Sequence, residues 1–137
     1  MSKLETAKAT LQEQDASCVA IKNDVVSLSH ERGIKPIVQW LAQDETFFKG
    51  AYVADKVIGR AAALLLVYGG VKELFAGVLS QPAAAVLAEH GVAYEYGKLV
   101  PHIINRTGDD MCPMERRALS ITLPEQAYET FKALILK

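Results

Sequence analysis

Hydrophobic and polar positions alternate along the chain with two periods, one helical and one strand-like. Near the N-terminus apolar residues recur every three or four positions, which predicts a helix over residues 3–15. Two short β-prone runs follow at 18–21 and 24–28. Asn23 and Asp24 lie between them and tolerate the positive φ of a tight turn, so the pattern predicts a β-hairpin.

The middle of the chain predicts a helix, a strand and a second, more apolar helix. An amphipathic pattern over 34–41 indicates the first helix, and residues 50–54 form a short apolar run typical of a strand. From Asp55 to Tyr68 the pattern is apolar almost all round, as in a helix buried on most sides. We expect Asp55 to cap the N-terminus of this central helix and the pair Gly69-Gly70 to end it.

The C-terminal half continues the alternation of strands and helices. Strands are expected at 71–78 and 92–96, and helices at 80–89 and 113–119. Thr122 and Glu125 have capping-box spacing and predict the start of a last helix. Strands that alternate with helices imply an α/β fold with parallel pairing and a sheet covered on both faces.

Length and composition narrow the class of protein. At 137 residues, with half of them hydrophobic and 23% charged, the chain fits one globular domain over 1–137, in which the terminal segments 1–16 and 122–137 are helical parts. A net charge of -1 argues against nucleic-acid binding by bulk electrostatics. The N-terminus lacks a signal-like apolar segment, and the longest apolar run, 61–68, is too short for a bilayer. We therefore expect a cytoplasmic protein without a membrane partner.

Three segments carry a resemblance to a known family. The run Tyr52–Ala62, the pair Asn105-Arg106 and the run Met111–Glu115 resemble an uncharacterised bacterial domain family, over most of the chain. The resemblance implies a cytidine-deaminase-like three-layer α/β/α sandwich with a mixed five-stranded sheet of order 2-1-3-4-5. It implies no particular reaction.

The same resemblance argues against zinc-dependent deamination. Zinc deaminases place a His or Cys two residues before a catalytic Glu, and add a Pro-Cys-x-x-Cys pair on the next helix. This chain has Val53 before Asp55 at the first place, and Ser80 and Ala83 at the second. None of Val53, Ser80 and Ala83 supplies a zinc ligand of the usual kind, so we expect neither metal nor cofactor.

Cys112 is the sharpest candidate for chemistry. If Pro113 takes the first helical position, Cys112 is the N-cap residue, and its sulfur faces the free amides of the first turn. Glu115 stands three residues on, where it can reach back to the amide of Cys112. Neighbouring acidic and basic residues oppose one another, so we expect only modest activation of the thiol. A purely structural cap is the alternative.

Asp55 and the residues around it form the second candidate group. Asp55 is either a simple helix cap or a general base in a crevice at the carboxyl ends of the strands. Lys56 is expected to pair with Asp55 or with an anionic ligand, or else to be solvated. Gly59 in the predicted central helix calls for an explanation, because glycine destabilises a helix interior by about 1 kcal/mol relative to alanine. That reason is close packing on the sheet, or room for a ligand or for the Cys112 loop.

Two arginines complete the candidate site. Arg106, beside Asn105, is able to hold a carboxylate or phosphate with two hydrogen bonds, although an ordinary surface turn explains it nearly as well. Arg32 stands before the second helix, where it can line the same pocket.

These observations lead to two main hypotheses. In the first, a zinc-less deaminase-like pocket lined by Asp55, Cys112 and Glu115 binds a small polar or nucleotide-like metabolite and acts on it as a hydrolase or transferase. In the second, the same residues form a non-enzymatic ligand-binding or redox-sensing module. A third places a metal between Asp55, Cys112 and Glu115. The apolar composition is also compatible with a homo-oligomer.

Overall fold

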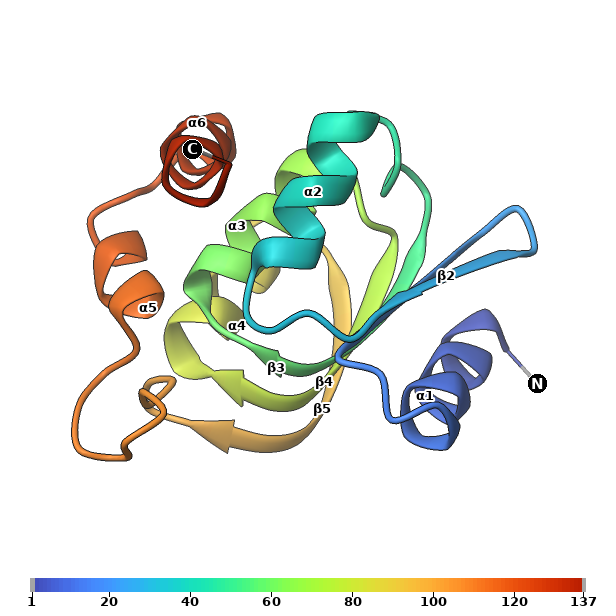
Figure 1. Ribbon diagram of the computed structural model, residues 1–137, viewed down its shortest axis with the longest axis horizontal. Helices are drawn as coiled ribbons and strands as arrows, with labels where there is room; N and C mark the ends of the chain where they lie inside the picture. The colour runs from blue at the N-terminus through green and yellow to red at the C-terminus, as the bar shows by residue number, and fades with distance from the viewer. Residues whose placement is uncertain (1, 137) are drawn as a thin grey trace.

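A five-stranded mixed sheet forms the centre of the protein (Figure 1). The computed structural model describes residues 2–136, so Met1 and Lys137, at the ends of the predicted domain, lie outside the described residues. The strand order is β2-β1-β3-β4-β5, as the resemblance implied. The elements in chain order are α1 (Lys3–Glu13), β1 (Cys18–Lys22), β2 (Val25–Ser29), α2 (Lys35–Gln43), β3 (Tyr52–Ile58), α3 (Arg60–Gly69), β4 (Glu73–Ser80), α4 (Gln81–Glu89), β5 (Ala93–Val100), α5 (Pro113–Ala118) and α6 (Pro124–Ile135).

The predicted hairpin is confirmed. Strands β1 and β2 pair antiparallel, and the turn residues Asn23 and Asp24 have φ values of 50° and 64°. Strand β1 also pairs antiparallel with β3, whereas β3, β4 and β5 run parallel to one another. The alternation of strands and helices therefore produced parallel pairing where it was predicted.

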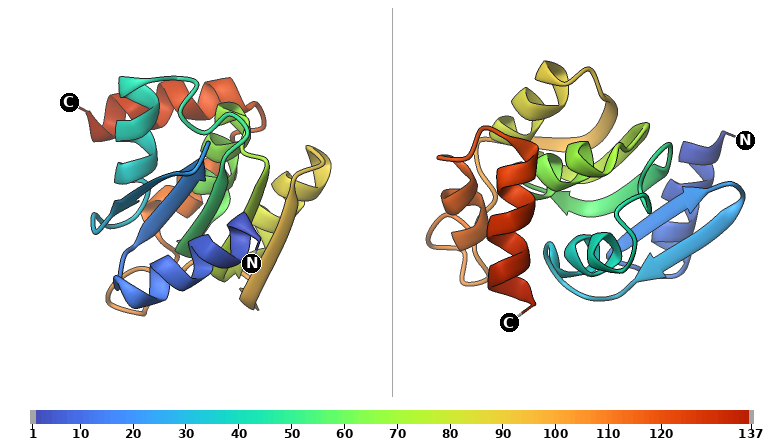
Figure 2. Two further views of the ribbon diagram at one scale, coloured as in Figure 1. Left: turned by 90° about the vertical axis from the view of Figure 1, so that its right-hand side faces the viewer. Right: turned by 90° about the horizontal axis from the view of Figure 1, so that it is seen from above.

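Helices cover both faces of the sheet, which gives the predicted three layers (Figure 2). Helix α1 alone packs on one face, against β1, β3 and β4. Helices α2, α3 and α4 lie on the other face, and α5 and α6 pack on the outer side of α3. Helix α3 is thus enclosed by the sheet and by its helical neighbours, as its apolar sequence predicted.

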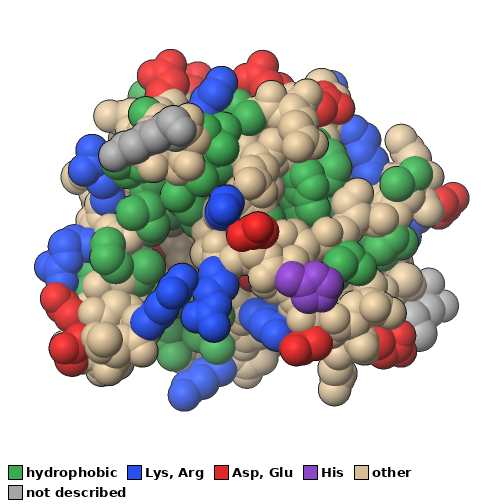
Figure 3. All heavy atoms as spheres, viewed as in Figure 1, with side chains coloured by type: hydrophobic (Ala, Val, Ile, Leu, Met, Phe, Trp, Pro, Cys, Tyr) green, Lys and Arg blue, Asp and Glu red, His purple; other side chains and the backbone are tan. Residues whose placement is uncertain are grey.

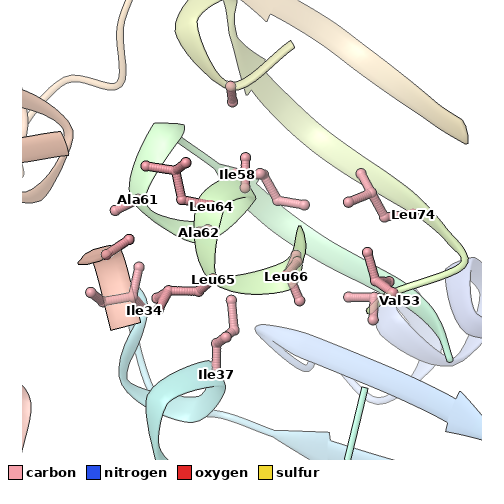
Figure 4. Packing of buried hydrophobic residues seen from close by; sticks show 14 of the residues in the cluster. Ile34, Ile37, Val53, Ile58, Ala61, Ala62, Leu64, Leu65, Leu66 and Leu74 are labelled. Atoms are coloured by element: carbon pink, nitrogen blue, oxygen red, sulfur yellow. The ribbon is translucent and has the colours of Figure 1, made fainter. Parts of the chain in front are cut away.

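The main core lies between the sheet and α3. Three consecutive leucines of α3, residues 64–66, have no exposed surface, and Ile37 of α2 and Val53 of β3 pack near them (Figure 4). A smaller cluster joins α1 to the opposite face of the sheet through Ala7, Val19 and Ala54. The larger core therefore fixes the start of α3, next to which the candidate residues lie.

The start of the central helix was predicted in the wrong place. Strand β3 continues through Asp55 to Ile58, and α3 begins at Arg60 with Gly59 as its N-cap residue. Asp55 is therefore a strand residue that pairs with Cys18 on one side and Ala76 on the other. Pairing on both sides of β3 outweighed the local capping preference of an aspartate.

Other boundaries also differ from the sequence pattern. Strand β5 extends to Val100, four residues beyond its predicted end. The capping box is wrong: Leu123 is the N-cap residue of α6, it makes no side-chain cap bond, and Pro124 lies in the first turn. Because proline pre-sets a helical φ, it can open α6 without the Thr122 hydroxyl.

Candidate functional site

The segment before Cys112 is a loop held by its own hydrogen bonds. The Asn105 side-chain oxygen accepts from the Gly108 amide at 2.9 Å, and the Asn105 side-chain nitrogen donates to Asp109 at 3.1 Å. The amide of Cys112 donates to the carbonyl of Ile103 at 2.7 Å, which closes the loop. Asn105 is thus occupied in shaping the loop that delivers Cys112 to the start of α5.

Cys112 is the N-cap residue of α5, as predicted, but its sulfur makes no cap hydrogen bond. The side chain is half-buried and the thiol is free. Arg116 in the same helix donates to Asp110 at 2.6 Å, so one of the nearby positive charges is paired within the loop. The exposed Arg106 lies at the tip of this loop.

Glu115 has a different role from the one predicted. Its side chain is 2% exposed, and its two carboxylate oxygens accept from separate backbone amides. One oxygen binds the amide of Arg60, at 2.5 Å, in the first turn of α3, and the other binds the amide of Ile103, at 2.7 Å. Glu115 therefore does not reach back to Cys112 but caps a helix 55 positions earlier in the chain.

The side chain of Arg60, in α3, reaches the other end of α5. Its guanidinium donates to the carbonyl of Ala118, the last residue of α5, at 2.8 Å and to that of Ile121, just after the helix, at 2.7 Å. A carboxylate at a helix N-terminus and a guanidinium at a helix C-terminus are both favoured by the helix dipoles. We call this pair, Arg60 and Glu115, the α3–α5 clamp.

Gly59 makes the clamp possible. A Cβ at this position would stand 2.9 Å from the Ile103 side chain and 3.1 Å from a carboxylate oxygen of Glu115. Of the reasons considered for this glycine, the structure thus favours close approach of the segment that carries Cys112.

Asp55 lies inside the sheet rather than at the mouth of a helix. It is 6% exposed, and its side chain accepts from the Val57 amide at 3.1 Å. Burial raises the pKa of Asp55 to about 7, against smaller opposing effects of hydrogen bonds from Val57 and Cys18. Burial and the neighbouring Asp55 raise the pKa of the Cys18 thiol well above its ordinary value.

The structure thus pairs Asp55 with Cys18, and Glu115 with Arg60 and Ile103. No hydrogen bond among residues 2–136 joins Asp55 to Cys112 or to Glu115. Cys18 is not among the residues that the sequence singled out. The signal that identifies its partner is the cross-strand register, which the sequence alone did not provide.

Lys56 points to the other face of the sheet from Asp55, since consecutive strand residues alternate. Its ammonium lies 2.7 Å from Asp15, which follows α1, so its partner is not Asp55. Arg32 is exposed in the segment before α2.

A hollow of about 330 Å³ opens beside Lys56, and we call it the α1 hollow. It lies between α1 and the sheet and is lined by Lys8, Leu11, Gln12, Asp15, Lys56 and Phe75. The Lys8 ammonium stands 4.7 Å from the centre of the Phe75 ring and 3.2 Å from Glu95. Sequence reasoning found only Lys56 of this group. The signal it missed is the polar series 8, 12 and 15, which follows one side of the first helix.

Other features of the described residues add little to the site. A second hollow, of about 220 Å³, lies beside the hairpin and is lined by Ala20, Lys22, Asn23, Val25, Ser27, Asp44 and Phe47. Across residues 2–136, no three His, Cys, Asp or Glu side chains gather in a way that could hold a metal ion. In the same span, every helix is too short or too polar to cross a bilayer.

Comparison with known proteins gives the family but no activity. Residues 6–135 match the family described as a domain of unknown function (DUF1893). A crystal structure of a DUF1893 family protein (TM1506) from Thermotoga maritima is similar, with a TM-score of 0.88 and 27% sequence identity over 96% of this chain and 88% of that one. No curated protein matches the chain. The expected resemblance to an uncharacterised family is confirmed, whereas the likeness to cytidine deaminases stays a prediction. The chain belongs to the DUF1893 family of domains of unknown function.

Proposed function

We propose that this protein is a non-enzymatic module that binds a small polar metabolite in the α1 hollow. The proposal keeps the non-enzymatic binding role of the second hypothesis and a deaminase-like topology without deaminase chemistry, but it moves the ligand away from Asp55, Cys112 and Glu115. The observation that carries it is the hollow itself, which Lys56, Gln12 and Phe75 line and where the Lys8 ammonium lies over the Phe75 ring.

The size of the hollow suits a small ligand. Its volume of about 330 Å³ lies at the lower end of the range of roughly 300–1,000 Å³ that small-molecule sites occupy. Leu11 and Phe75 provide an apolar floor, and the polar groups stand around it. A flat ring with polar edges, such as a nucleobase, fits this combination of an apolar surface and a few hydrogen-bonding groups.

The charges of the hollow favour a ligand with little net charge. Lys56 is paired with Asp15, and Lys8 is paired with Glu95. The hydrogen bond to Glu95 raises the pKa of Lys8, and the one to Lys56 lowers the pKa of Asp15, so each bond favours the charged form of that group. Two positive charges thus face two negative ones, and a nucleoside suits the site better than its phosphate ester.

The state of the predicted catalytic carboxylates supports binding rather than catalysis. Both oxygens of Glu115 are used by backbone amides, and Asp55 is sealed in the sheet beside Cys18. A general base must lie within hydrogen-bond reach of the proton that it removes from a substrate. For either carboxylate to reach a substrate, contacts that hold the fold together would have to break.

Titration of the isotope-labelled protein with nucleosides, followed by NMR, tests the proposal. We expect shifts at Gln12, Lys56 and Phe75, and at least tenfold weaker binding in Lys56→Gln. Lys132→Gln is the matched control, because Lys132 stands over the ring of Tyr128 at 5.3 Å on α6, outside the hollow. Shifts that avoid the hollow, or equal affinities of the two variants, would contradict the proposal.

Replacing Cys112 separates binding from catalysis. In a binding module, Cys112→Ser leaves nucleoside affinity unchanged, and the wild-type protein returns the nucleoside unaltered after long incubation. Conversion of the nucleoside by the wild type, lost in Cys112→Ser, would support the catalytic hypothesis instead.

A further inference from the structure

The two edges of the sheet are protected to very different degrees. Strand β2 forms one edge, and its residues Val25-Val26-Ser27-Leu28-Ser29 include neither a charge nor a proline. Strand β5 forms the other edge and carries Glu95 and Lys98. Natural sheets usually protect an edge with charges, prolines or a covering element, because its free backbone groups can pair with another strand. By this measure β5 is protected and β2 is not.

The side chains of β2 are also unusually exposed for their type. Val25 is 64% exposed, Val26 48% and Leu28 38%. Figure 3 shows hydrophobic side chains on the surface over the hairpin, at the right of the view. Scattered apolar residues are common on surfaces, but three within five positions of an unprotected edge strand indicate an interaction surface.

The hairpin turn sets which backbone groups are free. With a two-residue turn, Lys22 and Val25 form the first pair of the hairpin and exchange hydrogen bonds. In an antiparallel ladder such pairs alternate, so Val26 and Leu28 direct their N–H and C=O groups away from β1. These groups and their exposed side chains are the parts of β2 open to a new strand.

We propose that β2 pairs antiparallel with β2 of a second copy of this chain, about a two-fold axis at Ser27. The two sheets then join into one continuous sheet across the axis. An interface around a two-fold axis uses the same patch on both copies. Strand β2 meets this requirement, because Val26 of one copy lies opposite Leu28 of the other when the strand pairs antiparallel with itself. The proposal concerns an assembly and is independent of the ligand proposed for the α1 hollow.

The register centred on Ser27 brings exposed apolar side chains together and keeps Asp24 opposite a polar residue. It sets Val26 of each copy against Leu28 of the other, so that apolar side chains meet on one face. It also sets Asp24 of each copy, whose side chain is 92% exposed, against His30 of the other. A register centred on Val26 would instead set the Asp24 carboxylate against Leu28. The Asp24 carboxylate lies opposite a polar side chain rather than Leu28 only in the first register, which therefore favours Ser27 as the centre.

Sedimentation velocity over a range of protein concentrations tests the assembly. We expect the wild type to form a dimer whose dissociation constant rises at least tenfold in Val26→Lys, since the lysines enter the joined strands. Val57→Lys is the matched control, because Val57 is 44% exposed on β3, away from both edges, and should dimerise as the wild type does. A monomer at every concentration, or a dimer that Val26→Lys leaves intact, would overturn the proposal.

Disulfide trapping tests the register, in a Cys112→Ser background that removes the half-exposed native thiol. At the axis the two Ser27 residues form a non-hydrogen-bonded pair with Cα atoms about 4.5 Å apart, within the range that a disulfide spans. We expect Ser27→Cys to form a covalent dimer under mild oxidation and Ser29→Cys, which faces Val25, to form little. Equal trapping of the two variants, or none in Ser27→Cys, would overturn the register.

Discussion

Asp55 and Glu115 are two buried carboxylates in very different surroundings. Glu115 lies at a helix start, where each of its oxygens accepts a hydrogen bond from a backbone amide. Asp55 lies within a sheet, where neighbouring backbone amides of its own strand and the Cys18 thiol are its side-chain partners. The comparison shows that burial alone does not mark a catalytic group, because a buried carboxylate can equally be a device of the fold.

Because their hydrogen-bond partners differ, the two carboxylates should affect the stability of the protein in different ways. Glu115 stabilises the fold through two charge-assisted bonds that connect α5 to α3. Asp55 has too few donors to offset the cost of burying a charge, and it therefore holds a proton to about pH 7. Substitutions should consequently be most damaging at Glu115 and pH-dependent at Asp55.

The largest effect is expected for Glu115→Ala. Its loss leaves the part-buried amides of Arg60 and Ile103 without partners, and we expect unfolding to become easier by about 3–5 kcal/mol. Urea denaturation followed by circular dichroism measures the change. Glu125→Ala serves as the control, because Glu125 is an exposed acid in the first turn of α6. If the free energy of unfolding fell by the same small amount in both variants, the clamp would not stabilise the protein.

Asp55→Asn should remove a pH dependence rather than a fixed amount of stability. The unfolded chain releases the Asp55 proton near pH 3.8, whereas the folded protein releases it near 7. The stability due to protonation is therefore complete below 3.8 and is lost as the pH rises towards 7, by at most about 4 kcal/mol. Denaturation at several pH values should show this decline in the wild type and a shallower profile in Asp55→Asn. Parallel profiles would contradict the assignment.

Gly59→Ala tests the close approach that the clamp requires. The new methyl group would stand 2.9 Å from the Ile103 side chain, so the loop before Cys112 must move. Since φ at this position is -97°, the cost comes from crowding rather than from the backbone, and we expect about 1–3 kcal/mol. Thermal unfolding measures it, together with NMR shifts at Ile103. A variant as stable as the wild type, with unmoved Ile103 signals, would show that the space is not needed.

Ser80→Ala provides the smallest effect and a contrast with α3. Helix α4 is capped locally, by the Ser80 hydroxyl that accepts from the Ala83 amide at 3.2 Å. Loss of such a cap usually costs about 1 kcal/mol. Chemical denaturation should therefore rank Ser80→Ala well below Glu115→Ala. The opposite ranking would mean that the distant cap of α3 matters less than the local cap of α4.

Local patterns in the sequence predicted much of the fold. The hairpin followed from Asn23 and Asp24, whose turn conformation is a local property. The burial of α3 followed from its apolar composition. The start of α3 was predicted wrongly because the local sequence does not show whether Asp55 ends a strand or caps a helix. Only the pairing of β3 with β1 and β4 decides this.

The candidate site was less predictable, because its contacts cross the chain. Glu115 was predicted to act with Cys112 because of its local spacing, yet its hydrogen-bond partners are the amides of Arg60 and Ile103. The hollow beside Lys56 depends on how α1 lies on the sheet. Such contacts follow from tertiary packing rather than from the spacing of nearby residues.

The most direct test of the account is an NMR titration of the Asp55 side-chain carboxyl carbon. The claim is that this carboxylate belongs to the interior of the sheet and is not a solvent-facing base. For a carboxylate inside the sheet we expect a midpoint near pH 7, with a concerted change in the signals of Cys18. A midpoint near 4, with Cys18 unaffected, would contradict it and return Asp55 to the candidates for catalysis.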